Sequence, residues 1–114
     1  MTLAQTYSWL FYALALASRR EPVECKDIEQ VADAINHAVP TQKEMKESLA
    51  WLIRAGLAIK EGKAYSLADR GVALLNSHTN KVHTTMGVWK SIEKHFEDCG
   101  VDNVTNINPN TLAT

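Results

Sequence analysis

The N-terminal segment carries apolar residues on two sides of one helix. Over residues 2–19 the apolar positions recur with helical spacing, at about 100° per residue. One face holds Leu3, Tyr7, Leu10, Phe11 and Leu14, and the opposite face holds Trp9, Tyr12, Ala13 and Leu16. Both faces need a cover, and a 114-residue domain has little material to provide it. A second subunit is one natural cover, so we expect a homodimer.

Two more helices are predicted on either side of a tight turn. The first spans residues 27–38, with Asp27 as N-cap. Its apolar stripe is Ile28, Val31, Ala32, Ile35 and Ala38. Pro40 stops this helix, because the residue before a proline is pushed out of the helical region. The second spans residues 42–55. The capping-box sequence Thr41–Glu44 starts it, and Gly56 ends it in a left-handed cap. Its buried stripe is Met45, Leu49, Leu52 and Ile53.

One hairpin and two further helices follow. Residues 57–59 and 65–67 are short strand candidates, and Gly62 supplies the turn between them. A helix begins at Asp69 as N-cap and runs to about residue 76, with Val72 and Leu75 inward. The last helix, residues 82–98, places one arc of apolar side chains together: Val82, Thr85, Met86, Val88, Trp89, Ile92 and Phe96. We therefore expect one domain over residues 1–98 and a loosely ordered polar tail over residues 99–114.

Composition narrows the class of protein. Hydrophobic residues make up 46% and charged residues 22%, which is typical of a globular domain. The formal net charge of −1 shows no overall excess of basic residues, so any claim of DNA binding must rest on local charge. Two cysteines, Cys25 and Cys99, are too few for a disulfide framework and favour free thiols in a reducing compartment.

The apolar run at residues 8–17 does not have the pattern of a signal peptide. The first basic residues, Arg19 and Arg20, follow the run, whereas a signal peptide carries them before it. The run is also well short of the roughly 20 apolar residues that span a bilayer. We therefore expect a cytoplasmic protein with no membrane contact.

Two short passages carry a resemblance to a known superfamily. The run LAWLIRAGLA at residues 49–58 resembles the end of the recognition helix in winged helix-turn-helix transcriptional regulators. The run YSLADRG at residues 65–71 is similar to the passage in which the second strand of the wing leads into the next helix. Ala68 departs from this pattern, where the family usually has a threonine, and Asp69 moves the cap by one residue. The resemblance covers roughly residues 1–76.

The resemblance implies a fold and a function. The fold is mainly α with a small β-hairpin, a winged helix-turn-helix with extra N- and C-terminal helices. The helix at residues 42–55 would lie in the major groove of duplex DNA, and the hairpin at residues 57–67 would contact the phosphate backbone. The flanking helices would build the homodimer, and the side chains that we assign to its interface are Trp9, Tyr12, Leu16 and Trp89.

The exposed side of the helix at residues 42–55 supplies candidate DNA contacts. Lys43, Lys46, Ala50 and Arg54 would face the groove, and Lys60 and Lys63 of the hairpin would meet the backbone. Residues 41–70 hold six Lys or Arg against four acids, a net of +2, whereas residues 21–40 hold one Lys against five acids, a net of −4. Because each neutralised phosphate adds affinity, a net of +2 indicates weak binding by one copy and favours a dimer.

Several residues have a second interpretation. Trp51 falls near the exposed side of its helix and is either covered by the first or last helix or free to contact a partner. Glu44 and Glu47 oppose the lysines beside them. With the low net charge, they favour the alternative function, a winged helix that binds another protein rather than DNA.

Other chemistry is weakly represented. His95 and Cys99 are spaced for one face of a helix, but two ligands do not make a metal site. No nucleophile has an adjacent base in the sequence, and the five glycines never cluster into a phosphate-binding loop. We therefore expect no enzymatic activity, no cofactor and no metal.

Overall fold

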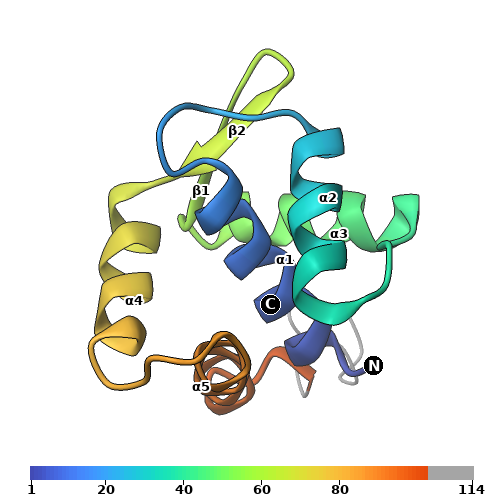
Figure 1. Cartoon of the computed structure of the whole chain (residues 1–114). Helices are drawn as coiled ribbons and strands as arrows, with labels where there is room; N and C mark the ends of the chain where they lie inside the picture. Colours follow the sequence, from blue (N-terminus) through green and yellow to red (C-terminus); the bar gives the residue numbers. More distant parts are fainter. Residues whose placement is uncertain (103–114) are drawn as a thin grey trace, which may run out of the picture.

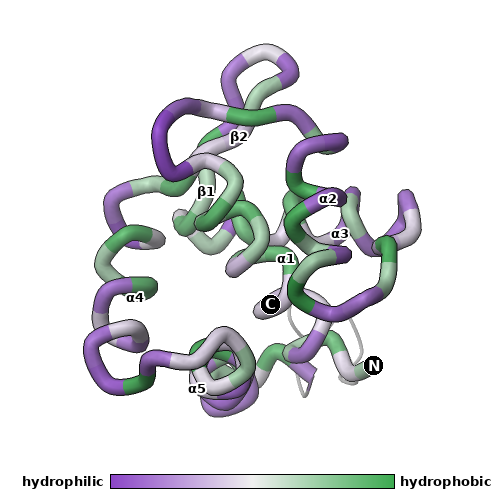
Figure 2. Tube along the Cα trace, viewed as in Figure 1, coloured by the Kyte–Doolittle hydropathy of each residue, from purple (hydrophilic) through white to green (hydrophobic). Residues whose placement is uncertain are grey.

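Helix α1 (Leu3–Ala17) lies at the centre of the fold, and the other elements pack around it (Figure 1). The computed structural model describes residues 1–102. Every side chain of α1 from Thr6 to Ala15 is buried, because α2, α3 and α5 of the same chain cover it from different sides. In Figure 2 the turns of α1 are mostly pale to green, whereas the hairpin turn and the loop after α1 are coloured hydrophilic.

The cover of α1 overturns our argument for a dimer interface. The Trp9 side chain is only 2% exposed, and its indole N–H donates a 2.9 Å hydrogen bond to the carbonyl oxygen of Ala32. Tyr12 and Trp89 are also buried, and Leu16 is half-buried. A single chain already removes Trp9, Tyr12 and Trp89 from water, so these side chains do not need a second subunit to cover them, and the homodimer stays a prediction.

The N-terminus of α1 is closed by residues distant in sequence. Thr2 and Gln5 form a capping box, and the carboxylate of Asp102 accepts hydrogen bonds from the N–H groups of Leu3, at 2.7 Å, and Ala4, at 3.3 Å. Val101 beside it is buried in the core. Two residues that we assigned to a loose tail therefore belong to the packed domain. The rest of that tail, residues 103–114, lies outside the described residues.

Helices α2 (Cys25–Asn36) and α3 (Gln42–Arg54) meet across the expected turn. The capping box predicted for α3 is confirmed: Glu44 N–H donates to Thr41 Oγ1 at 3.0 Å, and Thr41 N–H donates to Glu44 Oε1 at 2.9 Å. The start predicted for α2 is wrong, because Glu24 is the N-cap and Asp27 lies one turn inside the helix, where its carboxylate accepts the Glu24 N–H. On α3, the predicted stripe is buried except for Ile53, which is 37% exposed.

The hairpin is tighter than predicted. Strands β1 (Ala58–Glu61) and β2 (Ala64–Leu67) pair antiparallel, with Lys60 opposite Tyr65 and Glu61 opposite Ala64. Only two residues remain in the turn, and Gly62 occupies the first of them with φ 63°. A backbone pair that the sequence analysis missed joins Val23 to β2: Val23 N–H donates to Tyr65 O at 2.9 Å, and Tyr65 N–H donates to Val23 O at 2.7 Å.

Helices α4 (Asp69–Thr79) and α5 (Thr85–Asp98) complete the described chain. The N-cap of α4 is Ala68 rather than Asp69, and Val72, expected inward, is 45% exposed. The mainly helical class with one small antiparallel sheet is confirmed. Within residues 1–102 no helix is both long enough and apolar enough to cross a membrane.

Candidate nucleic-acid interface

Helix α3 turns a polar face to solvent. Lys43, Lys46 and Arg54 are exposed and Ala50 is half-buried, whereas Met45, Leu49 and Leu52 bury the opposite side. We call the line of Lys43, Lys46, Ala50 and Arg54 the α3 ridge. Lys43 Nζ lies 4.0 Å from Glu47 Oε1, and the side chains of this pair are 81% and 50% exposed. Such an exposed pair is weak, so Lys43 remains free to contact an anion.

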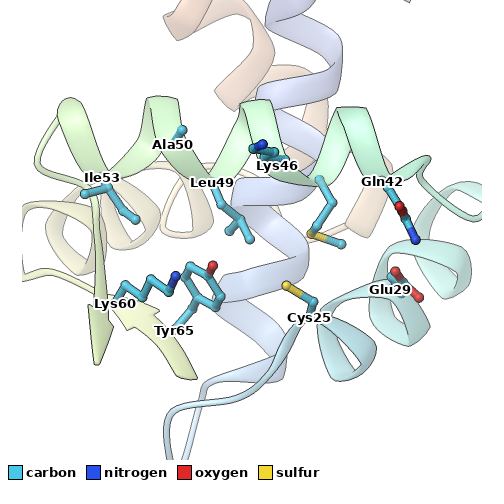
Figure 3. Close-up of a pocket in the computed structure, with 10 residues that line it drawn as sticks. Cys25, Glu29, Gln42, Lys46, Leu49, Ala50, Ile53, Lys60 and Tyr65 are labelled. Carbon is cyan, nitrogen blue, oxygen red and sulfur yellow. The ribbon is translucent and has the colours of Figure 1, made fainter. Parts of the chain in front are cut away.

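The α3 ridge stands between two open hollows. One, of about 580 Å³, is lined by Tyr7, Lys43, Glu47 and Arg54. The other, of about 520 Å³, separates α3 from the hairpin and the start of α2, and we call it the hairpin groove (Figure 3). Lys46 and Ala50 line both hollows. The ridge therefore borders both hollows, and its three cations are open to solvent.

The hairpin groove brings α3 and the hairpin together. In Figure 3, Lys60 and Tyr65 of the hairpin lie side by side below the helix that carries Lys46 and Ile53. Lys60 Nζ lies 5.6 Å from the centroid of the Tyr65 ring, within range of a cation–π interaction. This contact orients the Lys60 ammonium group. The groove also has an apolar floor that includes Met45 and Leu49.

A third lysine beside the hairpin was missed by the sequence analysis. Lys26, near the start of α2, lines a shallow hollow of about 320 Å³ together with Lys60 and Lys63. Glu24 lies at the same place and offsets part of their charge. No local sequence pattern marks Lys26, because Lys60 and Lys63, the lysines that lie near it, belong to the hairpin. It is positioned by the pairing of Val23 with β2.

Trp51 does not project freely from α3. Its ring stacks on Tyr7 of α1, with centroids 5.0 Å apart and planes at 20°. It also makes an edge-type contact with Phe96 of α5, with ring centroids 5.0 Å apart. The interpretation that the first and last helices cover Trp51 is confirmed. These contacts tie α3 to the helices on both sides of it.

Of the cysteine and histidine candidates, His95 and Cys99 are in contact, whereas Cys25 lies in the hairpin groove. Burial, followed by the nearby Glu29 carboxylate, raises the pKa of the Cys25 thiol in the hairpin groove, which favours the protonated thiol over the reactive thiolate. His95 Nε2 and Cys99 Sγ are 3.8 Å apart. In the part of the chain that the structure describes, no three His, Cys, Asp or Glu side chains gather where they could hold a metal ion.

Comparison of the chain with protein-family models, with curated proteins and with solved structures finds no match. The function must therefore be argued from the residues and their geometry.

Proposed function

We propose that this chain is a winged helix-turn-helix protein that binds duplex DNA as a transcriptional regulator. In this proposal the α3 ridge enters the major groove, and Lys60 and Lys63 of the hairpin contact the phosphate backbone. The observation that carries it is the α3 ridge itself, an exposed helix face with three cations that lies beside a hairpin with two more.

The order of the elements supports the fold part of the proposal. The chain forms first a helix, then two helices joined by a tight turn, and then a hairpin. Between the first two helices, Val23 pairs with the second strand of the hairpin. Through this pairing a third backbone segment, just before α2, joins the two strands of the hairpin. The hairpin is therefore held against the helical pair, as a wing that must contact DNA together with α3 would need to be.

The number of cations supports a modest affinity for one copy. The α3 ridge and the hairpin offer five of them, and Glu47 and Glu61 lie among them. Because affinity grows with the number of phosphates neutralised, we expect stronger binding from a homodimer on two half-sites. The interface of such a dimer would use residues other than Trp9, Tyr12 and Trp89.

The experiment is a titration of a fluorescently labelled, mixed-sequence duplex, followed by anisotropy at low salt. The test variant carries Lys43→Glu and Lys46→Glu. If each lost charged contact costs about 1.5 kcal/mol, the affinity should fall by about a hundredfold.

The matched control carries Lys90→Glu and Lys94→Glu on α5. It makes the same change in net charge, and each pair of substitutions also removes one exposed i,i+4 ion pair, Lys43–Glu47 or Lys94–Asp98. The control should keep most of the affinity. Equal losses in the two variants would mean that only overall charge matters, and the assignment of the α3 ridge would then fail.

A protein-binding module is the second candidate, and the hairpin groove favours it. Ile53 is 37% exposed there, and Met45 and Leu49 make the floor apolar. An apolar groove of this kind suits a side chain of a protein partner better than a phosphate. If the duplex does not bind even at low salt, Ile53→Asp becomes the variant with which to test partner binding.

A further inference from the structure

A separate hollow lies on another side of α3, away from the ridge. It has a volume of about 600 Å³ and is bounded by α3, α4 and α5. Trp51 lines it, and at about 100° per residue Trp51 lies about 140° around the helix from Lys46. We call it the α4–α5 hollow. It shares no lining residue with the hairpin groove, so an occupant would leave the candidate DNA interface uncovered.

Most of the side chains that line the α4–α5 hollow are apolar, and Arg70, His95 and Cys99 are its polar lining residues. Leu57, Leu74 and Phe96 line it together with one side of Trp51. The small side chains of Ala55 and Ala73 leave the space between the three helices unfilled. Its volume falls within the range of about 300–1,000 Å³ that is typical of sites for small organic ligands, which are mostly apolar with a few polar groups.

Arg70, an exposed cation, lies at the edge of this hollow. Arg70 makes no ion pair and no side-chain hydrogen bond with any residue in the range 1–102 for which the structure gives contacts. Its guanidinium lies over the backbone of Gly56, since Nη1 is 3.2 Å from the position that a Cβ on Gly56 would take. A guanidinium with free donors beside an apolar wall matches a carboxylate that is joined to an apolar group.

We propose that the α4–α5 hollow binds a small organic carboxylate with an apolar arm. The carboxylate pairs with Arg70, and the arm packs on Trp51, Leu74 and Phe96. The inference does not depend on DNA binding, because neither the hollow nor Arg70 belongs to the candidate interface. It assigns to this domain a ligand site that contacts α3 from behind the ridge.

The test uses the whole chain, labelled with nitrogen-15, and follows the three tryptophan indole N–H signals by nuclear magnetic resonance. The indoles of Trp9 and Trp89 donate to buried oxygen atoms, so their signals should stay in place, whereas the Trp51 signal should shift. The probes are 4-phenylbutyrate and octanoate, each compared with its neutral primary amide. Trp51→Phe assigns the signal.

The expected result is a saturable shift of the Trp51 signal with either carboxylate. The amide should bind at least about fivefold more weakly than the carboxylate, because a charged hydrogen bond is lost. Arg70→Gln should weaken carboxylate binding to the level of the amide, and Ala73→Phe should abolish it by filling the hollow. Arg20→Gln is the matched control, since Arg20 is exposed and lines none of the hollows described above.

Three results would overturn the inference. The first is no shift of the Trp51 signal with either probe up to about 10 mM, a concentration at which even a fragment-sized ligand of millimolar affinity binds. The second is equal affinity for the carboxylate and its amide. The third is an Arg70→Gln variant that binds the carboxylate as well as the Arg20→Gln control does.

Discussion

Replacing Gly71 with alanine tests how closely α4 packs against Leu57, which lies between α3 and β1. A Cβ at this position would lie 2.2 Å from the carbonyl oxygen of Leu57, whereas a carbon and a carbonyl oxygen in contact are about 3.3 Å apart. The helix must therefore retreat by about 1 Å. The same Leu57 oxygen accepts the N–H of Ala68 at 2.9 Å, just before α4 begins, so the retreat also strains that hydrogen bond.

The magnitude follows from three contributions. Overpacking costs about 1–3 kcal/mol, and a lost hydrogen bond costs about 1 kcal/mol. The better helix propensity of alanine returns about 1 kcal/mol. We therefore expect Gly71→Ala to lower the free energy of unfolding by about 2 kcal/mol and the melting temperature by about 10 °C. Thermal and urea unfolding followed by far-ultraviolet circular dichroism measure both quantities.

Gly62 provides the comparison. Its φ of 63° lies in the left-handed region, but a Cβ there meets nothing within 4 Å. Gly62→Ala should therefore cost only about 1 kcal/mol, and Gly62→Asn less, because asparagine tolerates this conformation. If Gly71→Ala stabilises the protein, helix propensity dominates and the close packing of α4 on Leu57 is refuted.

Three further variants test individual contacts. Ser48→Ala should raise the free energy of unfolding by about 1 kcal/mol, since the buried Ser48 Oγ has no hydrogen-bond partner among the described residues; a loss of stability in urea would contradict this. Asp102→Ala should lower it by about 1 kcal/mol, because two N–H groups of α1 lose their acceptor; an unchanged urea midpoint would show that this cap does not contribute. Burial, and then the adjacent Glu97, raise the pKa of the Glu93 carboxyl, so the folded state favours its protonated form and ionisation costs stability. Glu93→Gln should therefore unfold at higher temperature than the wild type near neutral pH, and the gap should close as the pH falls below the ordinary glutamate value; a gap that does not depend on pH would exclude the ionisation of Glu93 as its cause.

Local rules were enough to predict the most local features. The capping box of Thr41 and Glu44, the left-handed cap at Gly56 and the turn at Gly62 each depend on a few neighbouring residues, so spacing alone finds them. The predicted start of α2 was wrong for a related reason. Asp27 can cap a helix as its N-cap or bond back from its third position, and the sequence does not distinguish these two roles.

Features that depend on tertiary packing could not be predicted in the same way. The pattern of α1 showed two apolar faces but not what covers them, and the structure shows that helices of the same chain do so. The pairing of Val23 with Tyr65 is a single contact across 42 positions and leaves no periodic signal. Lys26 lies beside Lys60 and Lys63 only because of that pairing, so no pattern in the sequence groups the three lysines.

The measurement that tests the central claim most directly is the salt dependence of duplex binding, compared between the wild type and a variant with Lys60→Gln and Lys63→Gln. Each phosphate contact contributes about 0.9 to the slope of log affinity against log salt concentration. If the hairpin contacts the backbone while the α3 ridge lies in the groove, the wild type binds in a salt-dependent manner and the variant's slope is shallower by about 1.8. An unchanged slope, or no binding of the wild type at low salt, would contradict the account.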